Sequence, residues 1–471
     1  MTISSVAIIG AGPAGLVALD ALIREEKFSN IRLFERKQEA GGSWVYDQGP
    51  PERLRDLHQL SQRQADKIDP IPAQLPSYAP KTDTQRFMDS AVYSYLESNV
   101  DAATMQFSEE VFPDTVSANS VEKYGPNTPF RHNTVVKNWI QDLYKRKGYH
   151  DHLEFNTLVE LASKNASTGK WDLVLRRFGK KKDYLWKESF DALLVANGKF
   201  NVPFIPSIPG LQEYADQHFD SVVHTKSYRS REYFRDKRVV VVGAFISAID
   251  TLHDIIPVAT LPVISSKKKD TKLTPLYGSA PFKHPHIDNR GQITRVDAAT
   301  KTVYFDDGTH IDGVDHIIFG TGFSLSFPFL PGLDLSNSRT HGFYQLVSNI
   351  DDPTLAIVGC VTGGFTFRSF EWQAVLAARI FAGRAKLPSK EKQREWERER
   401  VARKGDNHQF LFIEPEFEEY FEGVREVATN DGPGRKLPKF EPHLVEIFTR
   451  GWERKMRRFI QNSYTGGNTK L

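Results

Sequence analysis

The chain has 471 residues, enough for two or three domains with sizeable cores, and its 62 Lys and Arg nearly balance its 59 Asp and Glu. The formal charge of +3 is too small to predict nucleic-acid binding. A single cysteine, Cys360, excludes an intramolecular disulfide and the redox-active cysteine pair of the flavoprotein disulfide reductases.

The N-terminus lacks the charged and then apolar pattern of a signal peptide. No window holds about eighteen consecutive apolar residues, so we expect no transmembrane segment. We therefore expect a cytoplasmic protein without a metal site. The sequence does not decide the oligomeric state, and a homodimer is one candidate.

The first element is an apolar, β-rich run from Val6 to Ile9, followed by Gly10-Ala11-Gly12-Pro13-Ala14-Gly15 and a helical sequence. Strand, G-x-G-x-x-G turn and helix predict a dinucleotide-binding βαβ unit. Gly10 would permit the tight turn, Gly12 the approach of a pyrophosphate, and Gly15 the packing of helix on strand. The next predicted strand ends in Glu35, where a ribose hydroxyl needs an acceptor.

A second glycine-rich turn follows Glu35 directly. Gly41 and Gly42 allow close backbone approach, and Trp44 can lie against a ring system. This G-G-x-W after an acidic strand end favours FAD over free NAD at the first site. The candidate FAD-binding residues are Gly10, Gly12, Pro13, Ala14, Gly15, Glu35, Arg36, Gly42, Ser43 and Trp44.

The middle of the first half is less regular. Residues 47–89 lack a clear period and predict an irregular excursion of the kind that covers a site. Residues 91–105 look partly helical, and 130–144 predict an amphipathic helix. We expect strands over 153–161, 171–177 and 184–195, and then a proline-rich exit from the domain over 202–210.

A second dinucleotide-type unit begins at Arg238, with a strand, Gly243 and a helix. Its third glycine position holds Ala248, which such motifs tolerate. Its second holds Phe245, where the backbone should approach a phosphate. This is a real departure from the pattern, and the ring either is accommodated or blocks the site. Gly243 and Ser247 are the candidate residues of this loop.

The strand over 261–264 ends in a run that contains Lys267 and Lys268. Cations at the end of the second strand of such a unit suit the 2′-phosphate of NADPH, whereas an acid would suit NADH. A solvated surface charge run is the alternative. Buried-strand character returns over 303–307 and 316–323, where Thr321 and Gly322 are further cofactor-binding candidates. The tail from about residue 387 is charged and mostly helical.

The chain resembles the flavin-containing monooxygenases, most closely their small soluble fungal members. The resemblance lies in the order and spacing of both glycine units, Gly42-Ser43-Trp44 and Gly320-Thr321-Gly322-Phe323. The resemblance implies an α/β fold with two Rossmann-like dinucleotide-binding domains. An NADPH domain (207–315) would be inserted into a discontinuous FAD domain (1–206 and 316–471), which ends in the helical tail.

The family's fingerprint, F-x-G-x-x-x-H-x-x-x-[FY], is only partial here. Its candidates are Phe219, His224 and Tyr228, but the gap from Phe to His is one residue short, and Ser221 replaces the glycine. We expect His224 to be structural rather than a proton carrier. Asn99 falls where the family places an asparagine beside the flavin, and it is the candidate catalytic residue; a turn or helix-cap asparagine is the alternative.

The resemblance implies that NADPH reduces FAD, that O₂ adds to give a C4a-hydroperoxyflavin, and that this transfers oxygen to a nucleophilic nitrogen or sulfur of a small molecule. Three alternatives stay open. Phe245 could close the NADPH site and leave a flavoprotein oxidase. The protein could bind flavin without turnover. A Baeyer–Villiger monooxygenase would share the two-unit plan and would be told apart by its use of ketones instead of thioethers.

Overall fold

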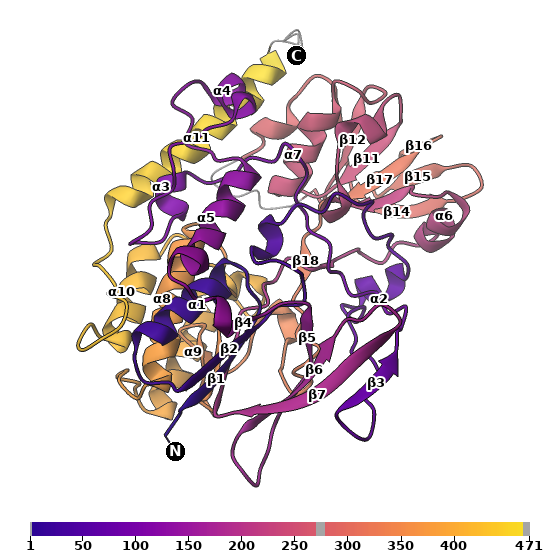
Figure 1. The fold of residues 1–471 in the computed structure, drawn as a ribbon. Helices are drawn as coiled ribbons and strands as arrows, with labels where there is room; N and C mark the ends of the chain where they lie inside the picture. Colours follow the sequence, from indigo (N-terminus) through magenta and orange to yellow (C-terminus); the bar gives the residue numbers. More distant parts are fainter. Residues whose placement is uncertain (1, 270–277, 465–471) are drawn as a thin grey trace.

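The computed structural model describes residues 2–269 and 278–464. Two units lie side by side, one built on a mostly parallel sheet and the other on an entirely parallel sheet, each with helices packed against it (Figure 1). The predicted fold class, α/β with two Rossmann-like units, is confirmed.

The first sheet draws its strands from distant parts of the chain. Its seven strands run in the order β19-β20-β21-β8-β1-β2-β4, and β1 pairs in parallel with both β2 and β8. The bounds are β1 (Ser5–Ile9), β2 (Asn30–Phe34), β4 (Leu153–Glu154), β8 (Ala192–Val195), β19 (Phe343–Tyr344), β20 (Ser348–Asn349) and β21 (Leu355–Ile357). Helices α1 (Pro13–Arg24), α5 (Asn133–Arg146) and α8 (Thr366–Phe381) pack together beside this sheet, and their apolar faces are buried.

The second sheet is entirely parallel, in the order β10-β17-β11-β12-β13. Its strands are β10 (Val222–His224), β11 (Val239–Val242), β12 (Val263–Ser266), β13 (Ile287–Arg290) and β17 (His316–Phe319). Helix α7 (Ile246–Ile255) follows β11, as the second glycine motif predicts.

One expectation about this sheet is wrong. The domain boundary expected at residue 316 places residues 316–319 with the first unit, but β17 lies between β10 and β11 of the second sheet. The chain re-enters the first sheet only at β19. A buried apolar run identifies a strand without identifying its partner, and the partners of β17 are decided by long-range packing. The second unit therefore extends past residue 315.

Smaller antiparallel sheets flank the two units. One contains β3 (Ser77–Pro80), β5 (Thr157–Lys164), β6 (Trp171–Arg177) and β7 (Lys182–Phe190); another contains β14 (Ile293–Asp297), β15 (Thr302–Phe305) and β16 (His310–Ile311); and β9 (Val202–Pro203) pairs with β18 (Phe323–Ser324). The single strand expected over 184–195 is thus two, β7 and β8. They are divided at Asp191, whose carboxylate accepts hydrogen bonds from the amides of Ser4 and Ser5.

The excursion over 47–89 is ordered. It contains α2 (Leu57–Ser61) and β3, which adds an outer strand to the antiparallel sheet. Asp69 and Arg86 of this segment join Glu160 and Arg176 of β5 and β6 in a buried ion-pair network. This network fixes the excursion against the first unit.

The helix expected within 91–105 is confined to α3 (Ala102–Met105). The preceding chain is irregular, with a turn at Ser94-Tyr95, because its carbonyl groups have other partners: the Asn133 side-chain amide donates to the carbonyls of Tyr93, Ser94 and Leu96.

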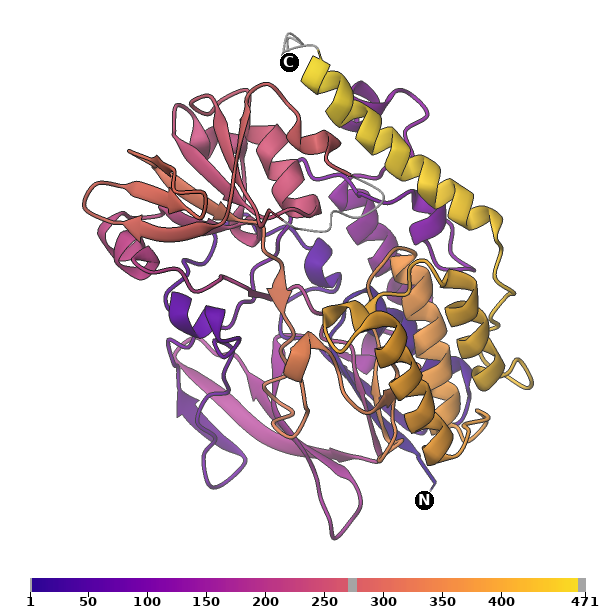
Figure 2. The same ribbon diagram turned by 180° about the vertical axis from the view of Figure 1, so that it is seen from behind.

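The tail is helical, as predicted, with α9 (Lys390–Lys404), α10 (Phe417–Ala428) and α11 (His443–Tyr464). Figure 2 shows α11 running along the molecule from the helices of the first unit to the second unit. The remaining helices are α4 (Ala118–Tyr124) and α6 (Leu211–Gln217). Within the described residues, no helix is long and apolar enough to span a membrane.

Candidate active site

A cavity of about 1200 Å³ lies where the two units meet, and both glycine loops line it. It also receives residues from the excursion over 47–89 and from α11. Sixteen of the seventeen residues predicted for the site line this cavity: Gly10, Gly12, Pro13, Ala14, Glu35, Arg36, Gly42, Ser43, Trp44, Asn99, Gly243, Ser247, Lys267, Lys268, Thr321 and Gly322. Gly15 does not, because it faces the strand, as its predicted packing role requires.

The first loop is built for close approach. Gly10 has φ +100°, and a Cβ there would lie 2.7 Å from the Ala196 carbonyl oxygen. A Cβ on Gly15 would lie 1.8 Å from the Gly10 carbonyl oxygen, so helix α1 could not pack on β1 with any other residue at this position. A Cβ on Gly12 would meet nothing nearer than Gly42 Cα at 3.6 Å. The space above Gly12 is therefore open on the cavity side.

Glu35 holds the loop in place as well as facing the cavity. One carboxylate oxygen accepts from the Ala11 amide at 2.7 Å and the other from the Lys37 amide at 2.8 Å. Each oxygen keeps a further lone pair for a ligand hydroxyl. Arg36 donates to the carbonyls of Arg86 and Phe87, and so joins the end of β2 to the excursion.

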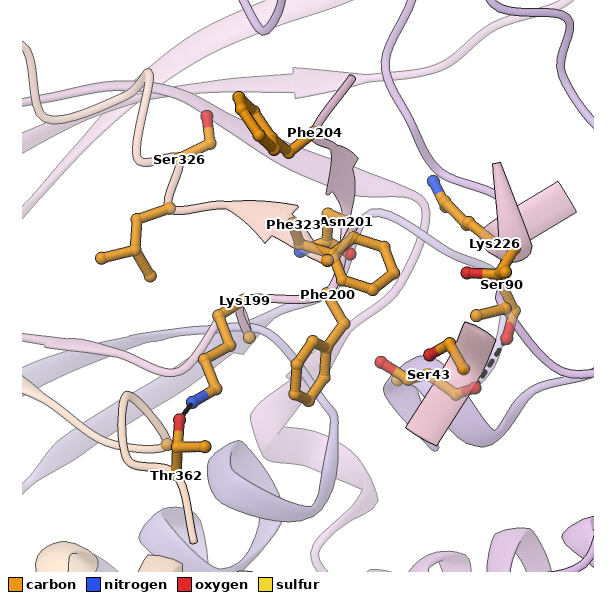
Figure 3. A pocket seen from close by; sticks show the side chains of 18 of the residues that line it. Ser43, Ser90, Lys199, Phe200, Asn201, Phe204, Lys226, Phe323, Ser326 and Thr362 are labelled. Atoms are coloured by element: carbon orange, nitrogen blue, oxygen red, sulfur yellow. Dashed lines mark hydrogen bonds between the residues drawn. The ribbon is translucent and has the colours of Figure 1, made fainter. Parts of the chain in front are cut away.

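Two further predicted residues stand on the wall beside this loop. The Trp44 ring packs edge to face on Phe367 at the start of α8, with 6.3 Å between ring centroids. Asn99 is half-buried in the irregular segment that precedes α3. Ser43 is fixed from the other side, because its carbonyl accepts from the Ser90 hydroxyl at 2.6 Å (Figure 3).

The second loop is packed as closely as the first, but it lacks the open space that the first loop has above Gly12. Gly243 has φ +134°, and a Cβ there would lie 2.4 Å from the Gly320 carbonyl oxygen. Ala248 packs against both glycines. Phe245 precedes α7 with an ordinary extended backbone, and its side chain is 47% exposed on the cavity wall. The ring is outside the core, at the place where a glycine would leave room for a phosphate.

Lys267 and Lys268 follow β12 and line the cavity. The Lys267 ammonium donates to the Asn289 side-chain oxygen at 2.8 Å and lies 4.3 Å from the centroid of the Phe282 ring. Burial lowers the pKa of Lys267.

His224 is fully buried and does not line the cavity. Its Nδ1 accepts from the Lys226 amide at 3.0 Å, so Nε2 carries the proton and donates to the Gly322 carbonyl at 2.9 Å. Burial lowers the pKa of His224 to about 3. A neutral imidazole with both nitrogens bound to backbone groups fits the expected structural role, and it ties β10 to the Gly322 turn.

Several cavity residues escaped prediction because their segments are far apart in the chain. Lys226 is buried and forms an ion pair with Asp89 at 2.8 Å. Phe448 and Trp452 reach the cavity from α11. Lys199 follows Asn197-Gly198 at the carboxyl end of β8, and in a parallel sheet this position is itself a signal for a ligand-facing residue.

Comparisons with known proteins agree with this geometry. The family model described as flavin-binding monooxygenase-like matches residues 88–274 and 286–440, and a model described as FAD-NAD(P)-binding matches residues 7–114. Together they confirm the predicted cofactors, FAD and NADPH, at the level of the family.

Two related sequences are named as monooxygenases. A flavin-containing monooxygenase of Aspergillus flavus, ustF2, is 26% identical, covering 85% of this chain and 86% of its own. The trimethylamine monooxygenase of Methylocella silvestris is 26% identical, covering 98% and 91%.

Solved structures share the fold. The S-allyl-L-cysteine S-oxygenase of Allium sativum superposes with a TM-score of 0.73 at 21% identity, over 99% of both chains. The structure of Tmm from a Pelagibacter strain gives a TM-score of 0.71 at 23% identity, covering 99% of this chain and 94% of its own. Since the family model covers well over half of the chain, this protein is an enzyme of the flavin-binding monooxygenase-like family.

Proposed function

We propose that this enzyme uses NADPH and O₂ to oxygenate a nucleophilic nitrogen or sulfur atom of a small molecule. The observation that carries the proposal is one cavity that both glycine loops and Asn99 line. Relatives named for trimethylamine oxidation and for S-allyl-L-cysteine S-oxygenation support a nitrogen or sulfur nucleophile.

The first unit suits FAD. The open space above Gly12, framed by the Gly10 turn and Gly42, is the cradle that a pyrophosphate needs at the start of α1. Glu35 would accept from the ribose, and Trp44 would border the ring system. We assign FAD to residues 1–206 together with the chain beyond β17, so the FAD domain is discontinuous.

The second unit suits NADPH. The start of α7, with Gly243 and Ser247, would face the pyrophosphate, and the two lysines after β12 would face the 2′-phosphate. Thr321 and Gly322 lie where the second unit leads back toward the first, and would border the nicotinamide half. We assign NADPH to residues 207–319.

Bound FAD would accept the hydride and activate oxygen, and the protein would orient the reactants and exclude water. The Asn99 side chain offers both a donor and an acceptor on the cavity wall. We assign it the task of holding the reacting oxygen by hydrogen bonds. The aromatic rings along the wall would keep water from that oxygen.

The test is spectroscopic. We expect a yellow holoenzyme whose flavin bleaches faster with NADPH than with NADH in anaerobic stopped flow. On admission of oxygen, a trialkylamine or thioether should give the oxide, and Asn99→Ala should release hydrogen peroxide instead while flavin reduction persists. A flavin that neither nucleotide bleaches would contradict the proposal.

The exposed ring of Phe245 favours a second candidate, a flavoprotein oxidase with an impaired NADPH site. The two candidates differ in their response to Phe245→Gly. If the ring obstructs the dinucleotide, the variant should accelerate reduction by NADPH greatly. If the pyrophosphate lies beyond the ring, the rate should stay within a fewfold of the parent.

A further inference from the structure

We propose that Arg63 and Lys199 form a carboxylate-binding end of the cavity, so that the preferred substrates carry a carboxylate beside the oxygenated atom. This rests on the proposed function, since it names the substrate class of the same site. The cation pair comes from two unrelated segments: Arg63 from the excursion, and Lys199 from the end of β8.

Both cations line the cavity, and each lies against a phenylalanine ring that lines it too. The Lys199 ammonium donates to the Val361 carbonyl at 2.5 Å and to the Thr362 hydroxyl, and it lies 5.5 Å from the centroid of the Phe200 ring (Figure 3). The Phe200 ring packs on Phe323 with 5.4 Å between centroids.

Arg63 meets the same group of residues at Phe323, whose carbonyl accepts from its guanidinium at 3.4 Å. Its guanidinium lies 4.0 Å from the centroid of the Phe204 ring and donates to the Ser324 hydroxyl at 3.2 Å. His408 also lines the cavity, and burial together with the charges of Arg63 and Lys199 lowers its pKa. The three basic groups therefore lie at one end of the cavity.

Neither cation has a counter-ion in the part of the chain that the structure describes: no ion pair there involves Arg63 or Lys199. Three of the carboxylates that line the cavity are bound to other groups. Asp89 pairs with Lys226, Asp250 with Lys455, and Asp254 accepts from two tyrosine hydroxyls.

Burial lowers the pKa of Arg63, and it lowers that of Lys199 to about 8. A desolvated cation without a counter-ion is stabilised by a bound anion.

The surroundings favour a carboxylate over a phosphate. The dinucleotide phosphates are assigned to the glycine loops and to the lysines after β12. The planar fork of Arg63 matches a carboxylate, and the rings of Phe200, Phe204 and Phe323 suit a short apolar chain. The occupant that fits both is a small carboxylic acid whose chain carries the amine or thioether.

Binding can be measured without turnover. The oxidised holoenzyme is titrated calorimetrically with hexanoate and with hexanamide, which match in length and differ in charge. We expect hexanoate to bind about tenfold or more tightly than hexanamide. Arg63→Gln and Lys199→Gln should each weaken hexanoate binding severalfold and hexanamide binding by less, because the amide carries no charge.

The matched control is Arg55→Gln, on the same segment, where the exposed guanidinium donates to the Asp83 carbonyl outside the cavity. It should keep the full preference. Equal binding of the two ligands by the parent, or a preference that survives both cavity substitutions, would overturn the proposal.

Turnover separates this inference from the proposed function. We expect 3-(methylsulfanyl)propanoate to be oxygenated with a higher kcat/KM than its amide, and the preference to fall in Arg63→Gln. If hexanoate binds as expected but neither thioether is oxygenated, the carboxylate site stands and the proposed function fails. If the two variants raise the KM for NADPH and keep the carboxylate preference, the cations serve the dinucleotide and the inference fails.

Discussion

Gly12 and Gly15 lie in the same turn, but glycine is needed at the two positions for different reasons. A Cβ on Gly15 would overlap the Gly10 carbonyl oxygen at 1.8 Å, whereas a Cβ on Gly12 has its nearest neighbour at an ordinary 3.6 Å. We expect Gly15→Ala to destabilise the fold itself. Gly12→Ala should fold normally and lose FAD, because the added methyl occupies the space that the pyrophosphate needs.

The measurements are the thermal unfolding midpoint of the apoprotein and the dissociation constant for FAD. Gly12→Ala should keep the parent's midpoint and weaken FAD binding at least tenfold. A midpoint that falls equally in both variants would show that Gly12, like Gly15, serves packing alone.

His224 makes stability depend on pH. Its pKa is about 6.5 in an unfolded chain and about 3 in the fold, where burial keeps the ring neutral. Below pH 6.5 the unfolded state takes up a proton that the folded state refuses. The contribution of His224 is therefore complete above pH 6.5 and is lost as the pH falls toward 3, at up to about 1.4 kcal/mol per pH unit.

His224→Gln keeps a donor for the Gly322 carbonyl and removes the titration. We expect it to be less stable than the parent at pH 8 and to lose less stability between pH 6.5 and pH 4, as followed by unfolding midpoints. His58→Gln, at an exposed position on α2, should follow the parent's profile. Parallel profiles for the parent and His224→Gln would contradict the assignment.

Among the elements, α1, α8 and the segment after α10 are joined by one buried guanidinium. Arg435 is fully buried and pairs with Asp20 at 2.5 Å, with Glu371 at 2.7 Å and with Glu110. Burial opposes its charge, but the carboxylates outweigh this and raise the pKa of Arg435. Arg435→Met should cost about 3–5 kcal/mol, because it leaves buried carboxylates without a partner.

Urea or thermal unfolding measures this loss. The control is Arg403→Met, which removes the exposed pair with Glu419 and should change stability by less than about 1 kcal/mol. Similar small losses in both variants would mean that the buried carboxylates are neutralised in some other way.

At the scale of helices and strands, the sequence predicts the features that depend on residues close together in the chain. The turn at Gly10, the helix after Gly243 and the lysines after β12 are local patterns, and the structure places them as expected. The partner of β17 and the cluster around Arg435 depend on residues up to 415 positions apart, which no local period records. The same holds for Arg63, since the excursion that carries it has no period and is positioned by buried ion pairs.

At the scale of the whole molecule, α11 joins the two units at the cavity. Lys455 pairs with Asp250 of α7 at 2.8 Å, and the Phe459 ring lies 4.5 Å from that of His253. Asp250 lines the cavity on the side assigned to NADPH. Lys455 therefore neutralises a carboxylate close to where the phosphates of the dinucleotide would lie.

Removal of this charge should weaken NADPH binding without affecting the flavin. We expect Lys455→Met to raise the KM for NADPH severalfold, most strongly at low ionic strength, with unchanged FAD content. Arg457→Met, at an exposed position on the same helix, should leave the KM unchanged. The double variant Lys455→Met with Asp250→Asn should recover most of the loss, because it removes the carboxylate that repels the phosphates. If the double variant is as impaired as the single one, α11 acts through packing of the two units and not through this charge.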